Sequence, residues 1–209
     1  MMTATVDERP MPASPGAMLH ASNLLTYVSL FLALGAVVAA LWYQSAHLAG
    51  AAIAASVITD TFDGRFARRF TRTVTERDFG VQLDSLVDAV CAGVAPVVVT
   101  AALLRPSGGL SGAIWVIGAF IYVVGAVTRL GFYNLTHEDT DSFIGLPAPV
   151  ASMFVATMLI WPLSFVAMST LLFGAGLAMM GGFRVPRPRG LGLALFALWP
   201  IVVILVHIL

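Results

Sequence analysis

Apolar stretches long enough to cross a lipid bilayer recur along most of this 209-residue chain, with short polar breaks between them. Hydrophobic residues make up 59% of the chain and charged residues only 11%, whereas soluble domains carry about 25% charged residues. A helix that crosses a bilayer needs roughly 20 mostly apolar residues. We therefore expect an all-α, polytopic transmembrane helix bundle of about six to seven spans, with no room for a separate soluble domain.

The polar breaks divide the chain into a tail and a membrane domain. Residues 1–22 are rich in proline and charge and are predicted to form a disordered cytoplasmic tail, which leaves 23–209 as the integral-membrane domain. The predicted spans are 23–44, 47–66, 80–104, 111–133, 147–163, 165–183 and 191–208. The fifth and sixth spans meet at Trp161 and Pro162 almost without a linker, so they form either a tight helical hairpin or one kinked segment, and we expect the hairpin.

The basic residues predict the orientation of this domain. Short cytoplasmic loops carry an excess of positive charge, and every basic residue here is an arginine. With the N-terminus inside, only Arg105 falls outside, and the remaining arginines fall on the cytoplasmic side: Arg9, Arg65, Arg68, Arg69, Arg72, Arg77, Arg129, Arg184, Arg187 and Arg189. We expect an inner-membrane protein whose N-terminus faces the cytoplasm.

Four aspartates lie where apolar spans meet this cytoplasmic side. Asp60 and Asp63 end the second span, and Asp84 and Asp88 begin the third. Ionised carboxylates at this depth are costly, so a bound cation or a partner is expected. Residues three or four apart share one face of a helix, and antiparallel helices joined by a short loop are normally neighbours, so the four carboxylates can converge. Oxygen ligands without histidine or cysteine favour Mg²⁺, Mn²⁺ or Ca²⁺.

The residues between these aspartates suit a phosphate-bearing ligand. Gly64, Ala67 and Gly80 leave space for close approach, and Arg68 can neutralise a phosphate. The alternative is that the aspartates form ordinary salt bridges with nearby arginines, which would not require a regular spacing. Elsewhere the interpretations are structural. Cys91 is expected to be a packing residue. Asn134 could recognise an acceptor but is expected to be a helix cap, and no two of the four histidines pair at metal-ligand spacing.

The aspartates belong to a longer pattern with a known likeness. The chain reads Asp60-x-x-Asp63-Gly64-x-x-Ala67-Arg68, then eleven residues, then Gly80-x-x-x-Asp84-x-x-x-Asp88. This pattern closely resembles the signature of the CDP-alcohol phosphatidyltransferases, which usually have eight residues in the middle segment rather than eleven. Within that family, the stretches 79–88, 93–96, 129–134 and 145–149 are most similar to bacterial and archaeal phosphatidylserine synthases. Cys91-Ala92 departs from the Ser-Phe pair that is common there.

The resemblance implies roles for these residues. Asp60, Asp63 and Asp84 would be direct ligands of two metal ions, Mg²⁺ or Mn²⁺, and Asp88 would lie near the second ion and act as general base. Gly64, Ala67, Arg68 and Gly80 would lie against the CDP moiety, and Arg129 would bind the acceptor, although Arg129 could equally be a topology anchor. The implied reaction transfers a phosphatidyl group from CDP-diacylglycerol to L-serine, giving phosphatidylserine and CMP, in a homodimer.

Two alternatives stay open. The same chemistry could use glycerol 3-phosphate, inositol phosphate or another alcohol as acceptor, although cationic residues for an acceptor phosphate are few in the spans beyond Arg129. A different class is a non-catalytic membrane protein or an ion carrier, for which ionisable residues near the bilayer midplane would be expected. No feature of the chain suggests a nucleic-acid partner.

Overall fold

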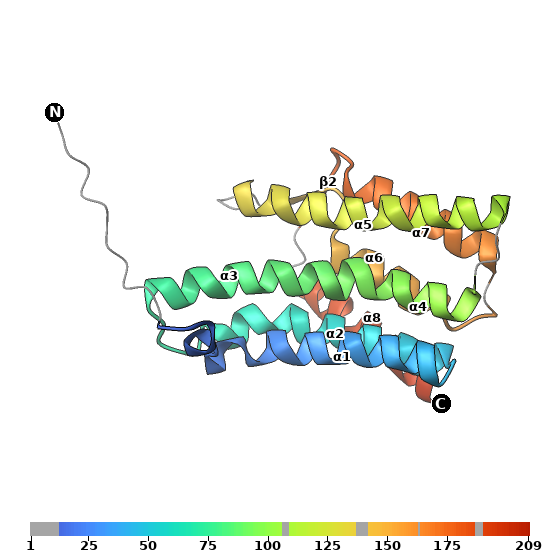
Figure 1. The fold of residues 1–209 in the computed structure, drawn as a ribbon. Helices are drawn as coiled ribbons and strands as arrows, with labels where there is room; N and C mark the ends of the chain where they lie inside the picture. Colours follow the sequence, from blue (N-terminus) through green and yellow to red (C-terminus); the bar gives the residue numbers. More distant parts are fainter. Residues whose placement is uncertain (1–12, 106–108, 137–141, 163, 187–189) are drawn as a thin grey trace.

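The computed structural model describes residues 13–105, 109–136, 142–162, 164–186 and 190–209 and confirms the all-α bundle (Figure 1). The elements in chain order are α1 (Leu24–Trp42), α2 (Ala46–Ala67), α3 (Val74–Asp88), the π-helical segment η3 (Ala89–Val94), α4 (Ala95–Leu104), α5 (Leu110–Thr136), β1 (Ser142–Ile144), α6 (Ala148–Met158), α7 (Phe165–Met179), β2 (Arg184–Pro186) and α8 (Leu191–Ile208). Because α3, η3 and α4 are continuous, the described ranges form seven helical rods that lie roughly parallel in Figure 1.

Among the described residues, three helical stretches are long and apolar enough to cross a membrane: 21–42, 74–104 and 110–135. Helices α6, α7 and α8 are shorter apolar helices. At 1.5 Å per residue, the 11 residues of α6 reach only about 16 Å, which is too short to cross a bilayer alone. The predicted fifth span was therefore too long, and the chain turns at Ile160 and Trp161, whose amides bond three residues back.

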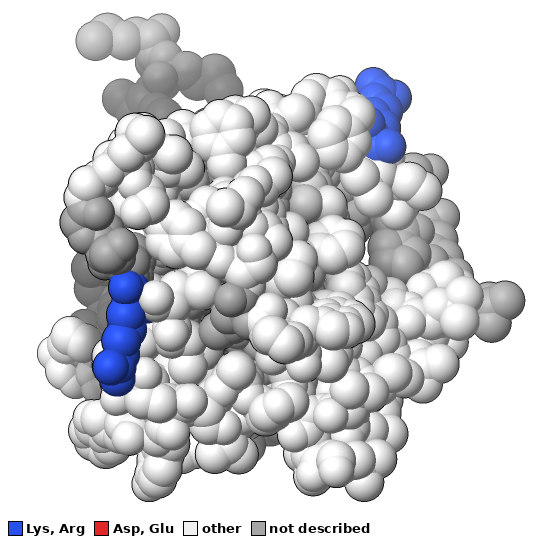
Figure 2. Space-filling model, turned by 90° about the vertical axis from the view of Figure 1, so that its right-hand side faces the viewer, with Lys and Arg blue, Asp and Glu red and all other residues white. Residues whose placement is uncertain are grey.

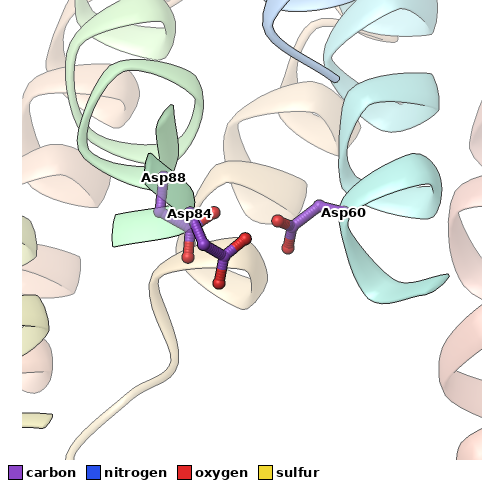
Figure 3. A group of neighbouring side chains, drawn as sticks. All are labelled: Asp60, Asp84 and Asp88. Atoms are coloured by element: carbon purple, nitrogen blue, oxygen red, sulfur yellow. The ribbon is translucent and has the colours of Figure 1, made fainter. Parts of the chain in front are cut away.

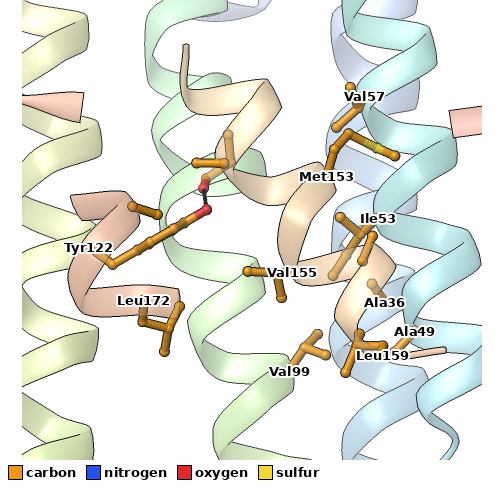
Figure 4. Packing of buried hydrophobic residues seen from close by; sticks show 14 of the residues in the cluster. Ala36, Ala49, Ile53, Val57, Val99, Tyr122, Met153, Val155, Leu159 and Leu172 are labelled. Carbon is orange, nitrogen blue, oxygen red and sulfur yellow. Dashed lines mark hydrogen bonds between the residues drawn. The ribbon is translucent and has the colours of Figure 1, made fainter. Parts of the chain in front are cut away.

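Small residues bring the helices close together. Figure 4 shows the centre of the bundle, where Val155 of α6 and Val99 of α4 pack towards Ile53 of α2. A side chain at Gly125 of α5 would collide with the backbone of Gly176 in α7, so α5 and α7 touch through their main chains. Close backbone approach of this kind is how helices associate in lipid.

Helix α3 begins earlier than the sequence analysis predicted. Thr73 and Glu76 form a capping box, in which the Glu76 amide donates to Thr73 Oγ1 at 3.2 Å and the Thr73 amide donates to Glu76 Oε2 at 2.8 Å. The first six residues of α3 were assigned to the cytoplasmic loop, and that assignment was wrong. Only residues 68–73 link α2 to α3, and Gly80 lies within the helix rather than at its start.

Two short strands lie between described helices, β1 between α5 and α6 and β2 between α7 and α8. Strand β1 pairs with β2 in antiparallel orientation, with Phe143 opposite Val185. Beside the ladder, the Gly145 amide donates to the Phe183 carbonyl at 2.8 Å, and the Leu146 amide donates to the Ala178 carbonyl at 2.9 Å. These bonds tie the start of α6 to the end of α7, so the two helices form the expected hairpin.

Two other expectations need correction. His47 and His207, which were expected to be unpaired, lie together at the far end of α2 and α8, with their Nδ1 atoms 3.2 Å apart. Their separation of 160 residues hid this contact from any spacing argument. In the predicted tail, 15–18 and 21–23 form 3₁₀ turns that bury Met18 and Ser22. Residues 1–12 lie outside the described ranges.

Candidate active site

Three of the four aspartates converge in space. Asp60 approaches from the last turns of α2, and Asp84 and Asp88 approach from successive turns of α3 (Figure 3). Each offers a carboxylate oxygen, and the three oxygens all lie within 4.8 Å of one another. All three side chains are half-buried. Three ionised carboxylates this close repel one another, and a bound cation would relieve the repulsion.

Asp63 lies beside this cluster rather than in it. Its side chain is buried, and its Oδ2 accepts a hydrogen bond of 2.9 Å from Thr26 Oγ1 on α1. The described partner of Asp63 is thus a threonine, not an arginine as the salt-bridge alternative required. Helix α1 thereby fixes the orientation of one carboxylate on α2.

All four aspartates line one cavity of about 800 Å³ at this end of the bundle. Its walls come from α2, α3, α5, the β ladder, the start of α6 and the start of α8, and include Gly64, Arg68, Ser85, Arg129, Tyr133, Asn134, Phe143, Pro147, Val185, Gly192 and Phe196. The cavity therefore combines carboxylates and arginines with an apolar wall. Such a lining suits a ligand that has both a charged head and an apolar part.

A smaller cavity of about 240 Å³ adjoins the first, and both are lined by Asp63, Gly64, Arg68, Val81 and Asp84. Its remaining lining residues are Ser22, Asn23, Thr26, Ala67, Arg72, Arg77 and Gly80. Every residue expected beside the CDP moiety thus borders one of these two cavities. Around Gly64 the nearest described atom to an added Cβ would be Arg68 Nη1 at 3.8 Å, so the space beside this glycine is open to the cavities.

Arg129 enters the larger cavity from α5. Its side chain is only 7% exposed, and its guanidinium carbon lies 5.2 Å from the ring centre of Tyr133 and 5.7 Å from that of Phe143. The Nε atom has no hydrogen-bond partner among the described residues. A buried arginine held between two aromatic rings differs from the interfacial anchor that was weighed as its alternative, because an anchor reaches outward to water.

Sequence reasoning missed a hydrogen bond between two polar side chains that line the cavity. Ser85 Oγ donates a hydrogen bond of 3.0 Å to Asn134 Oδ1, which joins α3 to α5. The interpretation of Asn134 as a helix cap was wrong, since Asn134 lies inside the last turns of α5. Its place at the end of the Arg129–Asn134 run, one turn beyond Arg129, was the available signal.

The residues present fit a bound divalent cation. Besides the three converging oxygens, the Oδ1 atom of Asp84 is buried and has no hydrogen-bond partner among the described residues. A buried carboxylate oxygen without a partner is costly, and a metal ion would satisfy it. The donor set consists of carboxylate oxygens, as hard cations require. Asp60, Asp84 and Asp88 are therefore the candidate ligands, with Asp63 adjacent.

Comparison with known proteins agrees with this geometry. The sequence profile of the CDP-alcohol phosphatidyltransferases matches residues 19–181, which is most of the chain and includes the four aspartates. The chain belongs to the CDP-alcohol phosphatidyltransferase family, and the resemblance drawn from the aspartate pattern is confirmed.

Individual relatives are similar over shorter stretches. A CDP-diacylglycerol–serine O-phosphatidyltransferase of Helicobacter pylori strain J99 is 37% identical over 135 residues, which cover 64% of this chain and 54% of the relative. Proteins of the same name from Mycobacterium bovis and Methanocaldococcus jannaschii are 30% and 32% identical, covering 84% and 68% of this chain and 66% of each relative. The chain thus spans about half the length of the Helicobacter relative.

Proposed function

We propose that this chain transfers a phosphatidyl group from CDP-diacylglycerol to L-serine, releasing CMP and forming phosphatidylserine. The observation that carries the proposal is the meeting of Asp60, Asp84 and Asp88 in a cavity that also holds buried Arg129. The names of the three relatives support serine as the acceptor. The scarcity of cationic side chains beyond Arg129 on the α5 side of the cavity supports an acceptor without a phosphate.

The proposed chemistry is a displacement at the lipid-bearing phosphorus of the donor. Asp88 accepts the proton of the seryl hydroxyl, whose oxygen forms the new P–O bond as the bond to the bridging diphosphate oxygen breaks and CMP leaves. Bound Mg²⁺ or Mn²⁺, two ions by the family resemblance, would neutralise the diphosphate and the departing CMP. Asp60, Asp63 and Asp84 would hold these ions, and Asp88 would lie near the second ion as well as accept the proton.

The two adjoining cavities suggest where the parts of the substrates lie. The smaller cavity is lined by Gly64 and Ala67 of α2 and Gly80 of α3, and Arg68 borders both cavities, so we place the CDP moiety there. The larger cavity extends from the aspartates to Arg129, and a guanidinium suits the carboxylate of serine. Phe196 and Pro147 supply the apolar side of the same cavity, next to which the acyl chains would remain in lipid.

We place the site at the cytoplasmic face of the inner membrane. Figure 2 shows the opposite end, where α1 and α4 end, and no acidic side chain and only small basic patches are visible among the described residues on that face. Arg105 lies at that end, where its guanidinium donates to Gln44 Oε1 at 2.9 Å, and its place away from the aspartates supports this orientation. Arg9, Arg187 and Arg189 lie outside the described residues. A homodimer stays a prediction, which native mass spectrometry in detergent would check.

The test is an assay of purified protein in mixed micelles with CDP-diacylglycerol, Mn²⁺ and labelled serine. We expect labelled phosphatidylserine and an equal amount of CMP. A panel containing glycerol 3-phosphate, inositol phosphate and inositol separates the acceptors. Release of CMP with one of these alcohols but not with serine would refute the serine assignment and leave the transfer chemistry in place.

Metal removal tests the other half of the proposal. Treatment with EDTA should abolish CMP release, and added Mn²⁺ or Mg²⁺ should restore it while Ca²⁺ serves as a comparison. Turnover that persists after complete chelation would contradict the assignment of the carboxylate cluster as a metal site. Absence of turnover with every alcohol and every metal would favour the non-catalytic alternative.

A further inference from the structure

The helix that carries Asp84 and Asp88 changes its winding directly after Asp88. Segment η3 is π-helical, and the amide of Ala95 bonds to the carbonyl of Val90, five residues back. Single π turns inside α-helices occur frequently at functional sites. The sequence supplies a cause here, because Pro96 has no amide hydrogen and its ring would press on the carbonyl four residues earlier, that of Ala92. The wider turn relieves this clash but leaves the Ala92 carbonyl without its usual α-helical donor.

A side chain from another helix supplies the missing donor. Tyr122 of α5 is completely buried, and its hydroxyl donates a hydrogen bond of 2.9 Å to the Ala92 carbonyl, the dashed contact in Figure 4. The contact is tight on its other side too, since a Cβ at Gly93 would lie 3.3 Å from the Cβ of Ala126. Helix α5 therefore docks on the π turn through one hydrogen bond and one contact between small residues.

The same face of α5 continues into the site. Residues 122, 126, 129 and 133 are separated by four, three and four positions, which places them on one side of the helix. Tyr122 and Ala126 contact the π turn, whereas Arg129 and Tyr133 line the larger cavity. A shift of α5 along or around the π turn would thus move Arg129 relative to Asp88.

We propose that Tyr122 is a positioning residue for the site. Its hydroxyl supplies the hydrogen bond that Pro96 cannot donate to the Ala92 carbonyl. This bond fixes α5 against the π turn and thereby fixes the position of Arg129 relative to Asp88 in the cavity. This inference rests on the proposed transferase function for its activity readout. It also makes a claim about metal binding that does not require turnover, because Asp88 is a candidate ligand at the start of the π turn.

The test compares Tyr122→Phe, which removes only the hydroxyl, with Tyr43→Phe, which removes the same group from a side chain that is 69% exposed. We expect Tyr122→Phe to lower kcat for CMP release by about 10-fold to 100-fold through misplacement of reacting groups. The Kd for Mn²⁺, measured by electron paramagnetic resonance without substrates, should rise about tenfold. Tyr43→Phe should change neither quantity, and values are normalised to folded protein from thermal unfolding.

A second variant isolates the hydrogen bond. Pro96→Ala restores a backbone amide that can donate to the Ala92 carbonyl, so adding Tyr122→Phe to it should cost much less than Tyr122→Phe alone. If the single variant folds poorly, the double variant still decides the matter, because it is expected to recover Mn²⁺ binding. Wild-type kcat and Mn²⁺ affinity in Tyr122→Phe, or an equal loss with and without Pro96, would overturn the proposal. A wild-type protein that binds Mn²⁺ but releases no CMP would refute the transferase function alone.

Discussion

At the scale of single residues, the site consists of three convergent aspartates, the adjacent Asp63 and the side chains that hold these groups in place. The spacing of Asp60, Asp84 and Asp88 indicates two helix faces, and the structure brings these faces together. The hydrogen bond between Thr26 and Asp63 joins residues 37 positions apart, and no local pattern connects them. The burial of Arg129 could not be predicted either, because the sequence around an arginine near the end of an apolar span does not indicate whether the side chain faces lipid, water or a cavity.

Replacing Asp88 should stop the chemistry and preserve the fold. Asp88→Asn removes the proposed proton acceptor but keeps the size of the side chain, and loss of a general base typically costs about 100-fold to 10,000-fold in rate. CMP release is the measurement. Asp78→Asn is the matched control, since Asp78 is an exposed aspartate of α3 that lines neither of the two described cavities. Unchanged turnover in Asp88→Asn would exclude the general-base role.

Replacing Thr26 should loosen Asp63. Thr26→Val keeps the shape of a buried side chain and removes the donor, and a hydrogen bond to a charged group contributes about 1.5 to 3 kcal/mol. We expect a lower unfolding temperature in detergent. We also expect that a higher Mn²⁺ concentration is needed for half-maximal CMP release. Equal Mn²⁺ dependence in the variant and the wild type would show that Asp63 does not need this support.

At the scale of elements, the apolar pattern located the helices but not all their ends. The apolar pattern predicts where a helix can lie in lipid, but it does not predict where a helix that continues into water begins or ends. Helix α3 does so, and its first turn is specified by Thr73 and Glu76 rather than by hydrophobicity. For α6 the error was the opposite, since the predicted span was too long. The apolar run continues past Met158, where the helix has already ended. The π turn is a third case, for which Pro96 was the only local signal.

The capping box can be tested by its removal. Thr73→Ala deletes the side chain that accepts from the Glu76 amide, and loss of such a cap costs about 1 kcal/mol. We expect faster proteolysis of the α2–α3 connection and a lower unfolding temperature. CMP release per folded molecule should change by less than about twofold, because the aspartates lie two or more turns further along α3. Thr75→Ala, at a position inside the first turn, serves as the control.

At the scale of the whole molecule, the arrangement of the helices depends on contacts between distant segments. Helix α8 packs against α2 and contributes Gly192 and Phe196 to the cavity, although nothing in its sequence indicates a partner. At the other end of α8, the buried His207 side chain lies over Gly50 of α2, and its Nε2 is 2.9 Å from the Ala156 carbonyl of α6. One residue thereby joins three helices at the end opposite the aspartates.

A methyl group at position 50 should disturb this junction. A Cβ added at Gly50 would overlap the His207 ring, and overpacking of this kind costs about 1 to 3 kcal/mol. Gly50→Ala should therefore lower the unfolding temperature. Combining it with His207→Ala removes the overlap, so the double variant should lose less stability than the two single changes added together. Simple additivity would show that the ring is free to move away. Gly35→Ala, where an added Cβ meets no described atom within 4 Å, is the control.

The short β ladder forms a part of the cavity wall that comes from outside the helices. Strand β1 supplies Phe143, whose ring centre lies 5.5 Å from that of Tyr133 on α5, and strand β2 supplies Val185. After β1 the chain turns at Gly145, whose backbone has φ +70°. None of the four aspartates lies on these strands. A substitution in this ladder can therefore change the shape of the cavity wall while the helices that carry the aspartates stay as they are.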